Sequence, residues 1–246
     1  MNATLTIAKR EFRSYFDSPV AYVVICIGLA ALGLVFFNLN GGFWQANRAS
    51  LMQMFMQVPR GLSWLVIPVI TMRLLAEEKH SGTLEMLITL PVKDHEVILG
   101  KFLGAWGLVL VLILSTVLYP IFMFEWPWDL GALDTGPIVS GYLGLIIYSA
   151  AAVSIGLLIS ALTESQIIAF FITFVLLFLL HFIGAGLTLS ILPPKAELVV
   201  AFISFDTRLV GFVRGLVNTR DVIYFVTITI GCLIGSFWAL ERRKWA

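Results

Sequence analysis

The chain has 246 residues, of which 59% are hydrophobic and 13% charged, and its formal net charge at pH 7 is +1. Because soluble globular chains are about 25% charged, this composition excludes an ordinary soluble domain and indicates an integral membrane protein. The near-neutral charge argues against a nucleic-acid-binding protein, which needs a concentrated excess of lysine and arginine. The two cysteines, Cys26 and Cys232, lie in apolar runs and indicate neither a disulfide framework nor a metal site.

The first predicted element is an amphipathic helix. Apolar side chains at positions 5, 8, 12 and 16 share one helical stripe, and three cations lie off it: Lys9, Arg10 and Arg13. This pattern predicts a helix in the inner interface, with its cations near anionic headgroups. Pro19 breaks it, and the apolar run at 20–37 is close to the roughly 20 residues that cross a membrane as helix.

The second predicted span covers residues 59–76, where Arg60 and Arg73 bracket the apolar stretch and Pro68 interrupts it. Arginine side chains near helix ends can extend to the interfaces, so we expect this segment to cross the membrane with both arginines reaching outward. The preceding segment, residues 43–58, is amphipathic and is expected to cover the outer side.

The next loop concentrates charge in a chain that has little. A charged side chain at mid-membrane depth costs about 2.5 to 3.5 kcal/mol, so this loop must lie in water or against protein. Gly82 permits a sharp entry, Pro91 ends the run, and Asp94 is expected to cap the following helix. Between them, apolar side chains recur at helical spacing: Leu84, Leu87 and Ile88. The loop therefore predicts a short docking helix across the cytoplasmic ends of two spans.

Further spans are predicted at 102–124, 138–161, 166–188 and 222–240. Ion-coupled carriers usually place a carboxylate at mid-membrane, and these runs contain none. His181 is the sole ionisable side chain deep in a span. No partner for it is evident in the sequence, so we expect a neutral imidazole hydrogen-bonded to a neighbouring helix.

The segment from Ser190 to Asp221 is long for a loop in so short a membrane protein. Apolar side chains at 205, 209, 212, 213 and 216 follow helical spacing, and arginines punctuate them: Arg208, Arg214 and Arg220. We expect these arginines to anchor the segment to outer headgroups, with a substrate site as the alternative. Cations beside the first span and in the final "ERRKWA" predict cytoplasmic termini. The sequence thus predicts one all-α integral membrane domain, residues 1–246, with six transmembrane helices.

No catalytic motif is recognised. The stretch "HEVILGKF" lacks the first glycine and the hydroxyl residue of a P-loop, and neither a Gly-x-Ser-x-Gly nor a His-Glu-x-x-His motif occurs. His80, His95 and His181 are not at metal-ligand spacing. An intramembrane enzyme is disfavoured because no constellation of carboxylate, serine and histidine is visible. We therefore expect a chain that is not itself an enzyme and holds no cofactor or metal.

The stretch "EEKHSGTLEMLITLPVKDHEVILGKF" resembles the signature of type-2 ABC transporter (ABC-2) permeases. The shared features are acidic residues leaving the second span, a Gly-Thr-Leu-Glu core, a later proline, and Gly-Lys opening the third span. In that family this segment is a coupling helix that inserts into a groove of the cytosolic ATPase. The resemblance assigns ATPase contacts to Glu77, Glu78, Gly82, Thr83, Leu84, Glu85, Met86 and Leu87.

The turn "ALTES" resembles the family's second cytoplasmic contact, which would comprise Thr163, Glu164 and Ser165. The stretches "FDTRLVGFVRGLVNTRDVIYF" and "LERRKW" resemble the gliding-motility type of ABC-2 permease. That likeness implies an outer helical hairpin before the last span and a periplasmic or membrane auxiliary partner. It also implies a cytosolic ABC ATPase dimer that carries ATP and Mg, a second permease, surrounding lipids, and a multi-pass location in the bacterial inner membrane.

These observations predict the permease subunit of an ABC transporter. It would couple ATP hydrolysis by a separate ATPase to movement of an amphiphilic or polymeric substrate. The alternative is an ATPase-driven component of a motility or envelope-assembly complex that performs mechanical work without a cargo. The substrate, its direction and the choice between a homodimer and a heterodimer stay open.

Overall fold

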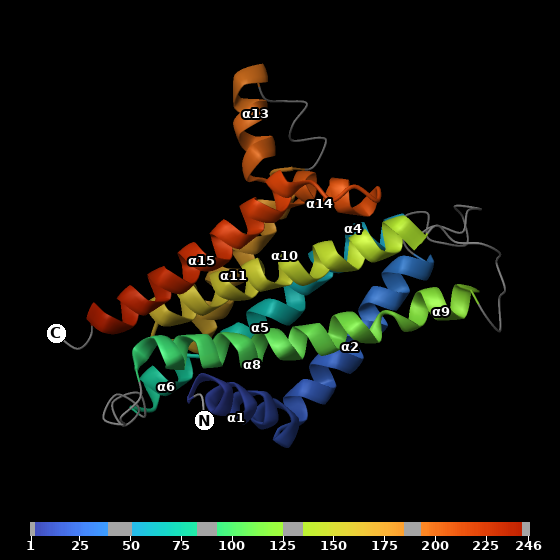
Figure 1. Ribbon diagram of the computed structural model, residues 1–246. Coiled ribbons are helices and arrows are strands. Elements are labelled where there is room, and N and C mark those ends of the chain that lie inside the picture. The colour runs from blue at the N-terminus through green and yellow to red at the C-terminus, as the bar shows by residue number, and fades with distance from the viewer. Residues whose placement is uncertain (1–2, 39–50, 83–92, 125–134, 185–192, 243–246) are drawn as a thin grey trace.

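The computed structural model describes residues 3–38, 51–82, 93–124, 135–184 and 193–242, and the regular elements in these ranges are helical. They are α1 (Ala3–Asp17), α2 (Pro19–Asn38), α4 (Met52–Gly61), η1 (Leu62–Val66), α5 (Ile67–Thr71), α6 (Ala76–His80), α8 (Asp94–Ser115), α9 (Leu118–Phe124), α10 (Thr135–Leu162), α11 (Gln166–Phe182), α13 (Pro194–Ile203), α14 (Phe205–Val213) and α15 (Thr219–Arg242). Helix α10 lies at the centre, in contact with α8, α11, α14 and α15 (Figure 1). Its side chains are buried along most of its length.

Within the described ranges, four helical segments are long and apolar enough to cross a membrane: Met52–His80, Asp94–Ile121, Thr135–Leu162 and Thr219–Arg242. Helices α1 and α2, bent by 74° at their junction, make a fifth if the pair is one span. Helix α11 lies within the predicted 166–188 span but has 17 residues, fewer than the roughly 20 that a span needs. The all-helical membrane architecture is confirmed, whereas six spans remain a prediction.

The second span begins earlier and is less regular than predicted. Helices α4, η1, α5 and α6 form one path from Met52 to His80, so the part of the predicted outer cover in α4 belongs to this path. The remainder of that predicted cover, residues 43–50, lies outside the described residues. Pro59 lies inside α4, Pro68 lies in the first turn of α5, and η1 between them is a π-helix. Prolines and π-helical turns interrupt the regular hydrogen-bond ladder, and π turns often occur at functional sites.

Helix α1 packs along α8. A Cβ atom at Gly100 would lie 2.6 Å from Ile7 Cγ2, and one at Gly104 would lie 2.7 Å from Glu11 Cβ. The absence of side chains at these two positions therefore lets the helices approach closely. The exposed side of α1 carries the cations expected near headgroups: Lys9, Arg10 and Arg13.

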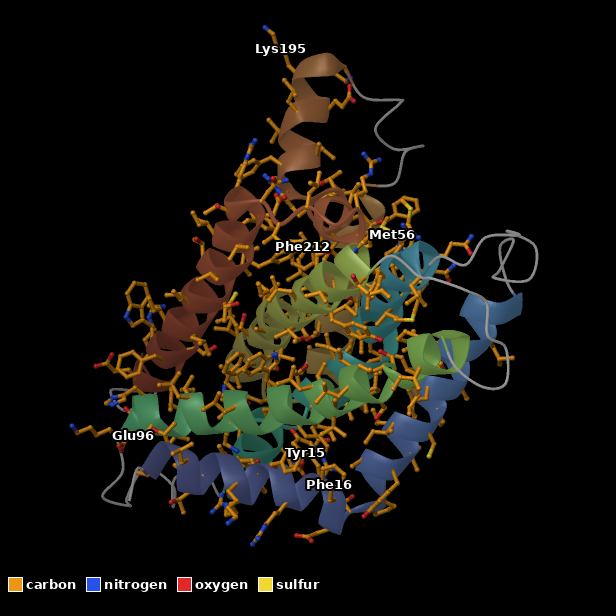
Figure 2. All side chains as sticks on the ribbon, turned by 45° about the vertical axis from the view of Figure 1, so that its right-hand side comes forward. Tyr15, Phe16, Met56, Glu96, Lys195 and Phe212 are labelled. Carbon is orange, nitrogen blue, oxygen red and sulfur yellow. The ribbon has the colours of Figure 1, made fainter. Side chains whose placement is uncertain are left out.

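Helices α13 and α14 lie at one end of the bundle, and α6, the start of α8 and the end of α15 lie at the other (Figure 1). Figure 2 shows Lys195 at the far tip of α13 and Glu96 at the opposite end of the molecule. Helix α14 begins at Phe205, where the predicted periodicity begins. Arg208 does not anchor to headgroups as expected, because its side chain is buried and its Nη1 donates to Asp221 Oδ1 at 2.9 Å.

Candidate functional site

Two groups of residues at opposite ends of the bundle are candidates for function. We call the first the α6 site, and it comprises α6, Gly82 and the turn Thr163–Ser165. Gly82 has a φ of 71°, a backbone conformation that favours glycine and permits a sharp turn, and the docking helix predicted to follow it lies outside the described residues. The remaining predicted coupling residues, Thr83 to Leu87, lie outside the described residues.

The turn Thr163–Ser165 lies beside α6. Ser160 Oγ accepts hydrogen bonds from the backbone N–H groups of Leu75 and Ala76, each at 3.0 Å. Lys79 Nζ donates to the carbonyl oxygen of Ala161, and Glu164 in the adjoining turn is exposed. Two segments that sequence reasoning assigned separately to the ATPase therefore form one surface.

The acidic residues of α6 take part in ion pairs within the chain. Arg73 donates to both Glu77 oxygens, at 2.8 and 3.2 Å. Lys101 Nζ lies 2.7 Å from Glu78 Oε1 and 3.1 Å from Glu11 Oε1. The ATPase contacts assigned to the two α6 glutamates stay a prediction. The geometry shows that Glu77 pairs within the second span and that Glu78 links α6 to α8 and, through Lys101, to Glu11 of α1.

Lys101 and Glu11 were not identified as site residues from the sequence. They line a cavity of about 360 Å³ between α1, the end of the second span and α8. The signal available in the sequence was a lysine inside an apolar helix, where an unpaired charge would be costly. Asp94 was expected to cap α8, but it is the first helical residue, and Glu96 Oε2 instead accepts from the N–H of Lys93 at 3.1 Å.

The second candidate is a polar cluster inside the bundle, formed by Arg60, Ser63, Tyr148, His181 and Asp206. Asp206 Oδ1 lies 2.6 Å from His181 Nδ1, and Arg60 Nη2 and Nε lie 2.5 and 3.2 Å from Asp206 Oδ2. His181 Nε2 lies 2.9 Å from Tyr148 Oη and 3.1 Å from Ser63 Oγ. The two hydroxyls also contact each other.

The cluster joins four parts of the chain. Arg60 and Ser63 come from α4 and η1 of the second span, Tyr148 from α10, His181 from α11 and Asp206 from α14. The ring of Phe205 packs edge-on against the rings of Tyr148 and His181. Apart from Arg60, the members are largely or fully buried, which makes their mutual hydrogen bonds strong.

The hydrogen bonds of Tyr148 constrain the protons in this cluster. Its hydroxyl donates to the carbonyl oxygen of Pro59 at 2.9 Å, since a carbonyl can only accept. His181 Nδ1 donates to the carboxylate of Asp206. The lone pairs of the Tyr148 oxygen then face Ser63 Oγ and His181 Nε2.

Asp206 carries a negative charge at neutral pH. Burial raises the pKa of its carboxyl group, but the hydrogen bonds from His181 and Arg60 outweigh burial and hold that pKa below its usual value. Because the pKa of Asp206 is lower in the folded state, its ionisation stabilises the fold at pH values above the unfolded-state pKa of about 3.9. That stabilisation is lost as the pH falls through the folded-state pKa. The cluster therefore keeps its carboxylate across the neutral range.

The cluster corrects two expectations from the sequence. His181 does hydrogen-bond to neighbouring helices, but it also has a carboxylate partner, Asp206, which the sequence did not reveal. Arg60 does not simply extend to an interface, because it forms an ion pair with that carboxylate. The sequence did contain one indication of the cluster. Its polar side chains lie within apolar stretches and have no hydrogen-bond partner nearby in the sequence.

Hydrogen bonds link Ser63 to His181 and His181 to Asp206, as in the triad of a serine hydrolase. No such constellation was visible in the sequence. Ser63 is fully buried, however, and its hydroxyl also contacts Tyr148. An acyl substrate cannot reach that oxygen in this conformation. The arrangement therefore ties helices together and does not present a nucleophile.

Comparison with known proteins adds a family to this geometry. The family model described as "ABC-2 family transporter protein" matches residues 61–240, which include the α6 site and most of the polar cluster. No curated protein matches the chain. Because the family match covers well over half of its length, the chain belongs to the ABC-2 transporter family and is a multi-pass membrane component of such a transporter.

Proposed function

We propose that this chain is the permease subunit of an ABC-2 transporter and works with a second permease and a cytosolic ATPase dimer. ATP hydrolysis on the partner would drive an amphiphilic or polymeric substrate across or out of the membrane. The proposal places both termini in the cytoplasm of a bacterium and includes six spans, with α2 as the first and α11 as the fifth. ATP and Mg belong to the ATPase in this account.

The observation that carries the proposal is the shared surface of α6 and the turn Thr163–Ser165. The two segments are far apart in the sequence, yet hydrogen bonds from Leu75 and Ala76 to Ser160 hold them together. Such a surface can transmit a push from one partner to two helices at once. The two helices are the second span, which ends in α6, and α10, which leads directly into the turn.

A second candidate function is an ATPase-driven motility or envelope-assembly component without a cargo. Helix α13 favours it, because it projects from the bundle (Figure 1) with exposed Leu198 and Val199 side chains that an auxiliary protein could cover. Lipids or glycans that co-purify with the complex and stimulate its ATP hydrolysis would support transport. Their absence, together with loss of activity when an auxiliary protein is removed, would support the second candidate.

Charge reversal tests the docking surface. We expect Glu85→Arg and Glu164→Arg each to lower the affinity of the chain for its ATPase about tenfold, equivalent to about 1.4 kcal/mol. Glu197→Arg is the matched control, since Glu197 is also exposed but lies on α13 at the other end of the bundle. ATPase recovered with the tagged permease and ATP hydrolysis in proteoliposomes are the measurements. Wild-type assembly and hydrolysis in both docking variants would contradict the proposal.

A further inference from the structure

Among the described residues, polar contacts join helix α14 to the second span and to α10, α11, α13 and α15. The carboxylate of Asp206 joins it to the second span and to α11, and Arg208 joins it to α15. Ser140 Oγ of α10 donates to the carbonyl oxygen of Phe212 at 2.7 Å. A short helix of nine residues does not need so many buried polar contacts for packing alone.

The fastened arrangement contains a buried polar group that is not satisfied. Ser204, directly before α14, is fully buried, and its hydroxyl has no hydrogen-bond partner among the described residues. A buried hydroxyl without a hydrogen-bond partner destabilises the arrangement that buries it. Moving α14 away from the bundle therefore needs less free energy, because water could then hydrogen-bond to the Ser204 hydroxyl.

The second span connects this end of the molecule to the α6 site. It carries Arg60 and Ser63 of the polar cluster near one end and α6 at the other. Between them lie the π-helix η1 and Pro68, where the backbone ladder is already interrupted. Thr71 packs tightly on α10, since a Cβ atom at Gly156 would lie 2.7 Å from Thr71 Cβ. A displacement of α6 can therefore reach Arg60 along one continuous chain segment.

We propose that the polar cluster is a latch that holds α14 closed and that ATP-driven movement of the second span opens it in each turnover. This inference rests on the proposed function and adds to it the regulation of the end opposite the ATPase. Arg60, His181 and Asp206 are positioning residues in this account, because they hold α14 and need not touch the cargo.

A reversible cross-link separates a latch from a static brace. A Cβ atom at Gly184, just after α11, would lie 2.7 Å from Ser204 Cβ. Disulfides need Cβ atoms about 3.5 to 4.5 Å apart, so Gly184→Cys/Ser204→Cys can be joined after a shift of roughly 1 Å. The background carries Cys26→Ala and Cys232→Ala. The pair Gly100→Cys/Ile7→Cys is the matched control, because its Cβ distance is also 2.7 Å and it joins α1 to α8.

The assay compares oxidised and reduced forms of the same sample in the full complex with the ATPase. Oxidation of the latch pair is expected to lower ATP turnover at least about tenfold, about 1.4 kcal/mol in the barrier, with recovery on reduction. Oxidation of the control pair is expected to leave turnover unchanged. A latch pair that turns over equally well when oxidised would overturn the proposal.

A second measurement does not depend on the cross-link. Asp206→Asn removes the charge that joins the second span, α11 and α14, so Ser204→Cys should react several-fold faster with an impermeant maleimide in the absence of ATP. Unchanged labelling, with Leu198→Cys as the exposed reference, would overturn the latch. If docking variants at Glu85 and Glu164 bind ATPase normally, the proposed function is wrong. If they do not, and the latch tests fail, only the latch is wrong.

Discussion

Lys101 shows how a charged side chain is accommodated inside an apolar helix. It is 2% exposed, and its ammonium group lies between the carboxylates of Glu11 and Glu78. A buried charge costs several kcal/mol unless it is paired. A second cation balances the two carboxylates, because Arg10 Nη2 lies 3.5 Å from Glu11 Oε1. Water also screens these charges, since the Glu11 and Glu78 side chains are 15% and 21% exposed.

Removing this cation should destabilise the fold more than removing the whole charge pair. Lys101→Met retains the length of the side chain but leaves two partly buried carboxylates without their cation. We expect the free energy of unfolding to fall by about 3 to 5 kcal/mol. Lys101→Met/Glu78→Gln should recover part of that loss, because one of the carboxylates is then neutral. Thermal unfolding in detergent measures both, and a melting temperature of Lys101→Met equal to that of wild type would be inconsistent with this account.

The residues of the polar cluster were hard to identify from the sequence for a physical reason. His181 and Asp206 are 25 positions apart and lie on α11 and α14. No helical periodicity relates them, and an isolated histidine or aspartate is common in many contexts. Gly82, by contrast, was predictable because its positive φ is a local property of the backbone.

At the scale of helices, apolar runs predicted the four long apolar helices among the described residues, because a continuous stretch of hydrocarbon needs no long-range information. The interruptions of the second span were less predictable. Pro68 was visible, but a π-helix depends on how neighbouring helices satisfy the backbone. The packing of α1 on α8 was not predicted, since an amphipathic pattern suits a membrane interface and a helix contact equally, and the interfacial position of α1 stays a prediction.

The contact between α1 and α8 can be tested with one methyl group. Gly104→Ala would place a Cβ atom 2.7 Å from Glu11 Cβ and 3.2 Å from the carbonyl oxygen of Ala8. We expect the overpacking to lower the free energy of unfolding by about 1 to 3 kcal/mol. Gly231→Ala in α15 is the control, because no atom lies within 4 Å of its added Cβ.

The two glycine variants should therefore differ in stability. Alanine is favoured over glycine in a helix by about 0.5 to 1 kcal/mol, so Gly231→Ala should be neutral or stabilising. Chemical unfolding in detergent measures both variants. A Gly104→Ala protein as stable as Gly231→Ala would show that α1 is not held closely against α8.

At the scale of the whole molecule, the second span connects the α6 site, which we propose binds the ATPase, with the polar cluster that contacts α14. The sequence predicted the class of protein, which the family match confirms, because the relevant residues are local and resemble a family signature. The ATPase contacts of the α6 site stay a prediction. It could not predict the fastening of α14, which depends on side chains brought together from separate helices. The link between the two ends is therefore a property of the folded chain.

The most direct test of this link is the reactivity of Ser204→Cys in the complete complex during ATP hydrolysis. Ser204 is fully buried when α14 is fastened. We predict that an impermeant maleimide modifies the cysteine several-fold faster during turnover than with ADP, and that Glu164→Arg abolishes the difference. An equal rate with ATP and ADP, in a complex that hydrolyses ATP normally, would contradict the account.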